Sequence, residues 1–225
     1  MNATIIKIGG SLALYPEKLK ALCIKLGELS KKHRLIVIPG GGEFSDVVRD
    51  LDKRFSLSAR ASHRMAILGM DQYGLLLSDL IPNSVTLCKL EEINCLLDSG
   101  GLPVFLPSNL LLRDDPLENS WDVTSDSIAV YLAERLQVNK VLLVTDVDGV
   151  YIDDPKTSKT KLIEQLSARE ALAMVKRTSV DKALPKLLLN LSIDCFVING
   201  LFADRVESVL DGFDVACTLI KGGLP

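Results

Sequence analysis

The stretch that decides the fold is Thr4-Ile5-Ile6-Lys7-Ile8-Gly9-Gly10-Ser11, close to the start of the chain. Residues 4–8 are mostly β-branched and predict a short strand, and the glycine pair behind them predicts a tight turn. An amphipathic segment, 16–31, follows and begins with a proline and a glutamate, as the first turn of a helix often does. Strand, turn and helix succeed one another repeatedly, which predicts a mostly parallel sheet with helices on both faces.

Short apolar runs and longer amphipathic runs alternate along the whole chain. The short runs predict strands over Thr4–Ile8, Leu35–Ile38, Ser84–Leu87, Leu102–Leu106, Val141–Val144, Cys195–Ile198 and Thr218–Ile220. The longer runs predict helices over Pro16–Lys31, Glu43–Lys53, Ser58–Leu80, Lys89–Asp98, Ser125–Leu136, Ala168–Met174 and Asp181–Leu191. The predicted fold class is therefore α/β, a three-layer α-β-α sandwich with a mainly parallel central sheet. Ligands of such sheets bind beyond the carboxyl ends of the strands, here after residues 8, 38 and 144.

The composition is that of a globular protein and argues against several kinds of partner. Because 26 Lys and Arg face 29 Asp and Glu, the net charge is -3 and no basic excess exists to bind nucleic acid. The longest uncharged stretch, 99–112, is shorter than the ~18 apolar residues of a membrane span. The five cysteines form no Cys-x-x-Cys pair, and Lys7 interrupts the apolar N-terminus. We therefore expect a cytoplasmic protein without a disulfide framework, zinc site, signal peptide or membrane segment.

The length suits one large α/β domain, and we expect a single domain over residues 1–225. A boundary near residue 120 would divide an acceptor half, 1–120, from a nucleotide half, 121–225, although one continuous sheet fits the length equally well. The longest loop-like stretch is Leu112–Asp122. The polar segment Asp148–Thr160 is expected to form a hairpin excursion.

Glycine-rich turns follow the first two predicted strands. Lys7 precedes the turn Gly9-Gly10-Ser11, and Gly40-Gly41-Gly42 follows the second strand. Backbone N–H groups in such turns approach phosphate oxygens without hindrance from a Cβ atom, and a helix N-terminus behind the turn attracts anions. Either turn alone could be ordinary loop structure. Two of them on neighbouring strands favour a site that holds phosphoryl groups between them.

Two polar motifs occur in the second half of the chain. Residues 121–129 contain Asp126 at the beginning of a predicted helix, where Thr124 or Ser125 could act as the cap, but capping explains only one polar residue of several. Residues 145–151 follow a hydrophobic strand and contain Asp-x-Asp-Gly. That pattern is like part of a calcium loop, yet position twelve is Thr157 instead of glutamate. A turn that lines a nucleotide fits better.

These four motifs, in this order and spacing, resemble the amino-acid kinase superfamily, which includes acetylglutamate, aspartate, glutamate, uridylate, carbamate and isopentenyl phosphate kinases. The resemblance covers essentially the whole chain. It implies the amino-acid kinase type of sandwich and an ATP-dependent phosphotransferase with Mg²⁺ carried by ATP. Within the superfamily, residues 40–46, 63–74 and 180–186 are most similar to the kinases of methanofuran biosynthesis. Those enzymes phosphorylate aminomethyl-furan-methyl phosphate to the diphosphate.

The resemblance also implies roles for individual residues. Lys7 matches the lysine that contacts the transferring phosphoryl group, and Asp126 matches the aspartate that orients the catalytic lysines. The family's second lysine usually follows a glycine pair, which Asp181-Lys182 replaces in this chain. Because Pro185-Lys186 still matches the family's final Pro-Lys, we place the second lysine at Lys186, with Lys182 as the alternative. The residues expected to bind ATP are Gly9, Gly10, Ser11, Thr145, Asp146, Gly149, Val150, Tyr151 and Lys182. The family's glycine before Thr218 is replaced by Cys217.

The acceptor site is expected around the second glycine turn and the helices behind it. The residues expected to contact the acceptor are Gly40, Gly41, Gly42, Glu43, Asp46, Arg60, His63, Arg64 and Asp71. The three basic residues, at helical spacing, are candidates for a phosphate, and the three acidic ones for an ammonium group. Each of these charged residues could instead belong to a solvated helix face. No protein metal site is expected.

Two alternatives remain for the function. A different acceptor is one, but the resemblance to isopentenyl phosphate kinases would require a histidine shortly after the glycine triplet, and that to uridylate kinases an arginine. Residues 43–46 contain neither. A non-catalytic storage protein on the same fold is the other, although it would not need Lys7, Asp126 and Lys186 together. The expected partner is a small phosphorylated molecule, and the resemblance implies a homo-oligomer.

Overall fold

The central sheet is built around β1 (Thr4–Ile8), all five residues of which are buried. The structure, a computed structural model, describes residues 3–152, 160–174 and 179–223. Within them the sheet has the order β3-β4-β2-β1-β5-β9-β10-β8. Its other strands are β2 (Leu35–Pro39), β3 (Ser84–Leu87), β4 (Leu102–Phe105), β5 (Lys140–Thr145), β8 (Gln165–Ser167), β9 (Asp194–Asn199) and β10 (Cys217–Lys221). Neighbouring strands are parallel except β9 and β10, so the predicted fold class is confirmed.

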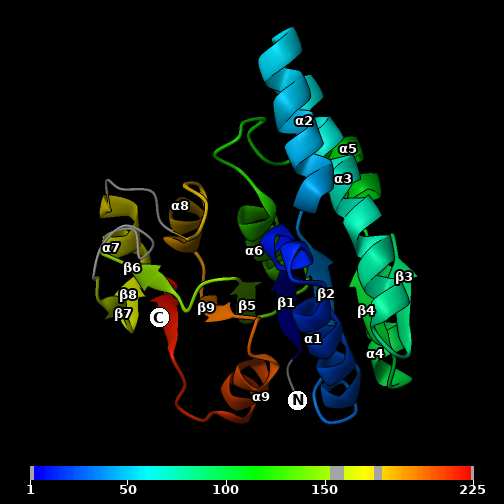
Figure 1. Cartoon of the computed structure of the whole chain (residues 1–225), viewed down its shortest axis with the longest axis vertical. Coiled ribbons are helices and arrows are strands. Elements are labelled where there is room, and N and C mark those ends of the chain that lie inside the picture. Colours follow the sequence, from blue (N-terminus) through cyan, green and yellow to red (C-terminus); the bar gives the residue numbers. More distant parts are fainter. Residues whose placement is uncertain (1–2, 153–159, 175–178, 224–225) are drawn as a thin grey trace.

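Helices cover both faces of the sheet (Figure 1). They are α1 (Pro16–Leu29), α2 (Gly42–Phe55), α3 (Ala59–Leu80), α4 (Glu91–Asp98), α5 (Ser108–Asp114), α6 (Ser125–Arg135), α7 (Ala168–Ala173), α8 (Leu184–Leu188) and α9 (Ala203–Asp211), with the 3-10 helix η1 (Gly10–Leu14) directly after β1. Figure 1 shows α2 and α3 packed side by side and extending beyond the sheet. The strands β3, β4, β2 and β1 precede residue 120, and the remaining four follow it, so the two parts of the chain meet where β1 pairs with β5.

Side chains of β1 alternate between two apolar layers because successive residues of a strand point to opposite faces. Ile6 and Ile8 join the layer that contains α1 and α9, whereas Ile5 joins the layer that contains α6. Lys7 has the same parity as Ile5. The strand therefore directs the Lys7 side chain toward α6, within an otherwise apolar layer.

Most predicted elements lie within a few residues of the observed ones, and the differences have local causes. The helix expected over 181–191 covers only Leu184–Leu188; it begins late because Pro185 has no backbone N–H and can occupy only the first turn. Helices α5 and α9 were not predicted; α5 begins within an uncharged run. The expected excursion over 148–160 begins and ends in the hairpin of β6 (Val150–Tyr151) and β7 (Leu162–Ile163), while residues 153–159 lie outside the described part.

Within the described residues, no helix is long and apolar enough to cross a membrane. All five cysteines lie in this part of the chain, and all are free thiols.

The two glycine turns pack against each other so closely that a Cβ atom on Gly10 would overlap the backbone nitrogen of Gly42. We predict that Gly10→Ala destabilises the protein by about 3 kcal/mol or more, because the backbone itself must move. Gly100→Ala is the matched control: its added Cβ meets nothing within 4 Å, and its φ of 80° leaves a strain cost of about 1–2 kcal/mol. Urea unfolding of both variants checks this. An equal or smaller loss for Gly10→Ala would contradict the close packing.

Candidate active site

The turns after β1 and β2 lie side by side at the carboxyl ends of the strands. Gly9 donates its N–H to the Val144 carbonyl at 2.7 Å, and Gly40 donates to the Ile8 carbonyl at 2.8 Å. Helix α2 begins at Gly42, whose φ of 56° suits glycine better than other residues. The N-terminus of α2, with its unpaired N–H groups, is thereby directed at the space beyond β1, a position that suits an anion.

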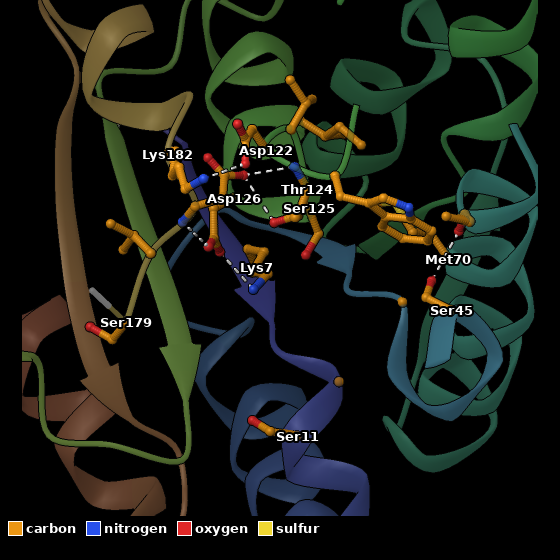
Figure 2. A pocket seen from close by; sticks show the side chains of 18 of the residues that line it. Lys7, Ser11, Ser45, Met70, Asp122, Thr124, Ser125, Asp126, Ser179 and Lys182 are labelled. Atoms are coloured by element: carbon orange, nitrogen blue, oxygen red, sulfur yellow. Dashed lines mark hydrogen bonds and ion pairs between the residues drawn. The ribbon is translucent and has the colours of Figure 1, made fainter. Parts of the chain in front are cut away.

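Lys7 and Asp126 form an ion pair between β1 and the first turn of α6. The Lys7 Nζ lies 2.7 Å from Asp126 Oδ1, and the two side chains are only 9% and 10% exposed. Figure 2 shows the two side chains pointing toward each other. The sequence prediction paired these two residues by resemblance, and the structure brings them into contact.

Asp181 caps α6, a role for which the sequence had offered Thr124 or Ser125 as possible residues. The Asp181 carboxylate accepts hydrogen bonds from the backbone N–H and hydroxyl groups of both Thr124 and Ser127, at 2.5–3.0 Å. It also accepts one from the N–H of Leu184, at the start of α8. Burial, followed by the nearby charge of Asp126, raises the pKa of Asp181, against the opposite effect of these hydrogen bonds.

A cavity of about 1080 Å³ opens over these elements and receives side chains from both parts of the chain. The predicted site residues that line it are Lys7, Gly10, Ser11, Gly41, Gly42, Glu43, Asp46, His63, Asp126 and Lys182. Such a volume suits a ligand of nucleotide size or larger. The cavity therefore joins most of the predicted phosphate and acceptor residues in one site.

The structure separates the two candidates for the second lysine. Lys182 lines the cavity, and its Nζ lies 2.9 Å from a carboxylate oxygen of Asp122, as the dashed line in Figure 2 shows. Lys186, on α8, is not among the described residues that line the cavity; both lysines are exposed, so only their positions distinguish them. The lysine was predicted at 186 because Pro185-Lys186 matches the family's final Pro-Lys, with Lys182 as the alternative. The place of Lys182 on the cavity wall supports the alternative, and the assignment of the second lysine stays a prediction.

The other residues expected to bind the nucleotide, within 145–151, lie at and beyond the end of β5, next to the cavity. The Ser11 hydroxyl donates to Asp146 Oδ1 at 2.8 Å, which joins the first glycine turn to this loop. The Ser179 hydroxyl, on the cavity wall, donates to the Gly149 carbonyl at 2.9 Å. None of residues 145–151, all of them described, lines the cavity itself. They form an adjoining edge that includes Thr145, Val150 and Tyr151.

Several predicted acceptor residues have other partners. Arg64 donates to the Leu112 carbonyl at 3.2 Å, and the Asp71 carboxylate accepts from the N–H and hydroxyl of Ser108, so both hold α5 in place. Arg60 is exposed. Arg60, Arg64 and Asp71 are not among the described residues that line the cavity. Helical spacing had grouped Arg60, His63 and Arg64 as one candidate phosphate site, but only His63 lines the cavity.

His63 does line the cavity, but as a neutral group. It is 7% exposed, and this burial lowers the pKa of its imidazole below the ordinary value of 6.5, despite the charge of Asp115 and a hydrogen bond with the backbone at Ser120. At neutral pH the imidazole can donate or accept a hydrogen bond with a ligand, but it supplies no positive charge.

Arg49 and Trp121, both on the cavity wall, had no predicted role, although Trp121 begins the motif at 121–129. The guanidinium carbon of Arg49 lies 4.2 Å from the centroid of the Trp121 ring, and the indole N–H donates to Asp52 at 2.7 Å. Arg49 follows Gly42 by seven residues and Asp46 by three, so it shares a face of α2 with both. That spacing was the signal that could have identified it.

Backbone donors, a helix N-terminus and a buried lysine around one cavity define the class of the protein, an α/β enzyme that handles phosphate groups. The model of the amino acid kinase family matches residues 2–199. A (5-(aminomethyl)furan-3-yl)methyl phosphate kinase of Methanocaldococcus jannaschii is 38% identical over 97% of each chain. A uridylate kinase of Methanosarcina barkeri is 28% identical over 92% of this chain and 91% of its own.

Solved structures share the fold over nearly the whole chain. The uridylate kinase of Archaeoglobus fulgidus superposes with a TM-score of 0.76 at 20% identity, and covers 98% of this chain and 100% of its own. The UMP kinase of Ureaplasma parvum gives 0.78 at 18% identity, with 98% of both chains covered. The protein belongs to the amino acid kinase family, and it is a kinase.

The burial of His63 predicts a pH dependence of stability. In the unfolded chain its imidazole takes up a proton near pH 6.5, whereas in the folded protein burial opposes this uptake. The unfolded state therefore binds more protons below pH 6.5, and the free energy of unfolding should decrease there. Urea unfolding at pH 5.5 and 7.5 is expected to show a smaller decrease for His63→Gln than for the wild type. Equal decreases in both proteins would contradict the buried, neutral imidazole.

Proposed function

We propose that the protein is an ATP-dependent kinase that phosphorylates a small, aminated phosphate monoester, of the aminomethyl-furan-methyl phosphate type, to the diphosphate. The observation that carries this proposal is the buried pair of Lys7 and Asp126 at the meeting point of two glycine turns. A non-catalytic binding protein has no need of a lysine held in this position. The relative from Methanocaldococcus jannaschii supports the choice of acceptor.

Phosphoryl transfer mainly requires in-line positioning and positive charge on the oxygens of the transferring group. An oxygen of the acceptor phosphate attacks the γ-phosphorus of ATP, its new P–O bond replaces the bond to the β-phosphate, and ADP leaves. Lys7 would contact the transferring group, and Lys182 would stabilise the charge on the phosphates of ATP from the other wall of the cavity. A phosphate oxygen is already ionised at neutral pH, so the reaction needs no general base.

The residues present fit ATP and its metal ion. The turn at Gly10 and Ser11 would hold phosphate oxygens, and the loop 145–151 would contact the adenosine. Mg²⁺ usually binds substrate phosphates together with one or two carboxylates and several waters, so it needs no set of protein ligands. When bound, Mg²⁺ would offset the charge of the β- and γ-phosphates.

The acceptor would bind along the cavity face of α2. Its phosphate would lie near the helix N-terminus at Gly41 and Gly42, close to Lys7. Asp46 lies one turn further along, a rise of about 6 Å at 1.5 Å per residue. Glu43 and Asp46 are therefore positioned to receive an ammonium group at the opposite end of a short molecule. His63 could add a hydrogen bond from α3.

The first test of this proposal compares three lysines. Lys7→Ala is expected to lower kcat by about 10²–10³, because it removes a charge that stabilises the transition state. Lys182→Ala should lower kcat as well, whereas Lys186→Ala should retain nearly wild-type turnover. Steady-state kinetics well below the melting temperature provide the measurement, since Lys7→Ala also leaves Asp126 buried and unpaired. Loss of activity in Lys186→Ala with activity retained in Lys182→Ala would return the role to Lys186.

The second test concerns the ammonium group of the acceptor. Asp46→Asn is expected to reduce kcat/KM about fivefold for an aminated phosphate monoester, and to leave that of its amine-free analogue unchanged. The matched control is Asp50→Asn, which alters an exposed carboxylate one turn along α2 that pairs with Lys53 at 3.1 Å. Equal losses on both acceptors would exclude recognition of the amine by Asp46. Higher kcat/KM for UMP than for any aminated acceptor would contradict the proposed substrate class.

The assembly state and location of the protein are also part of this proposal. We propose a cytoplasmic homo-oligomer, and light scattering of the purified protein tests the assembly.

A further inference from the structure

We infer that Asp181 is a positioning residue, which acts through Asp126 to hold Lys7 and through its own chain segment to hold Lys182. This inference rests on the proposed function, in which those two lysines act on the transferring phosphate.

The Asp181 side chain joins two helices that are distant in sequence. Its carboxylate receives five hydrogen bonds, four from residues 124 and 127 at the start of α6 and one from Leu184 at the start of α8. Thr124 occupies the N-cap position of α6, yet its side chain makes no capping hydrogen bond. A residue more than fifty positions along the chain does this instead. The segment that carries Lys182 is thereby attached to the helix that carries Asp126.

The backbone of Asp181 completes the connection. Its N–H donates to Asp126 Oδ2 at 3.2 Å, while Asp126 Oδ1 binds Lys7 at 2.7 Å. Both oxygens of Asp126 are thus engaged, and rotation of its carboxylate would break one contact or the other. Any movement of Asp181 therefore alters the orientation of Asp126, and with it the position of the Lys7 ammonium.

A purely structural role explains this arrangement poorly. Two carboxylates lie close together here, and the charge of Asp126 opposes ionisation of Asp181. A neutral Ser, Thr or Asn would cap the helix without that repulsion. Helix α7 is capped locally, by Ser167 and Glu170 three residues apart. A carboxylate brought from a distant segment, against repulsion, indicates that the segment itself has to be held in place.

The test combines kinetics with a double-mutant cycle. Asp181→Asn replaces one carboxylate oxygen by a donor that faces the N–H donors of α6, and is expected to lower kcat about tenfold, with KM for ATP changed less than threefold. In an Asp126→Asn background the same substitution should have little further effect, because residues that act as a unit are not additive. The matched control is Glu170→Gln, which weakens the cap of α7 and should lower the melting temperature without lowering kcat.

A second readout does not depend on the acceptor. Acetylation of lysines, followed by mass spectrometry, should be slow at the paired and buried Lys7 of the wild type, faster in Asp181→Asn, and unchanged in Glu170→Gln. If the wild type transfers no phosphoryl group from ATP to any acceptor, the proposed function is overturned. The acetylation measurement would still test the inference about Asp181. If Asp181→Asn does not fold, Ser127→Ala removes one donor to the same carboxylate and should give a smaller change of the same kind. Wild-type kcat with unchanged labelling, or additive effects in the cycle, would overturn the inference.

Discussion

The buried ion pair of Lys7 and Asp126 is the interaction on which the arrangement of the site depends. Removing two charges from water costs several kcal/mol per ion, and their attraction offsets this cost only when the geometry is good and the remaining polar atoms have partners. Here Oδ2 of Asp126, the oxygen that does not contact Lys7, accepts a hydrogen bond from the N–H of Asp181. The N-terminus of α6 also favours the negative charge of Asp126. The pair is therefore tolerated in the apolar layer only because several elements converge on it.

The central position of β1 makes this convergence possible. β1 pairs with β2 on one side and with β5 on the other, so the loops after all three strands open at the same edge of the sheet. The glycine turns allow the backbones after β1 and β2 to approach each other, and the Ser11–Asp146 hydrogen bond joins the first turn to the loop after β5. The backbone N–H groups of the glycine turns and the Lys7 side chain are thus fixed relative to one another by the sheet.

Much of the fold followed from the sequence because it rests on local signals. The strand at residues 4–8 and the glycine turns depend on residues adjacent in the chain, and the contact between Lys7 and Asp126 was expected from four motifs in a known order. The capping role of Asp181 was missed because Asp181 caps a helix that begins near residue 124. A local sequence pattern cannot indicate a contact between residues so far apart in the chain. Arg64 and Asp71 were misplaced for a related reason. Spacing on α3 shows that side chains share a face, but only tertiary packing shows that this face holds α5.

The strand β10 explains a departure from the family pattern, in which a glycine precedes Thr218. The Thr218 hydroxyl accepts a hydrogen bond from the Val150 N–H at 2.8 Å and donates to the Ile163 carbonyl, so it attaches both strands of the β6–β7 hairpin to the main sheet. Neighbouring side chains of a strand point to opposite faces. Cys217 therefore points away from the hairpin, toward the apolar layer of α1 and α9. Substitution at position 217 can therefore follow the packing of that layer, whereas the attachment of the β6–β7 hairpin constrains position 218.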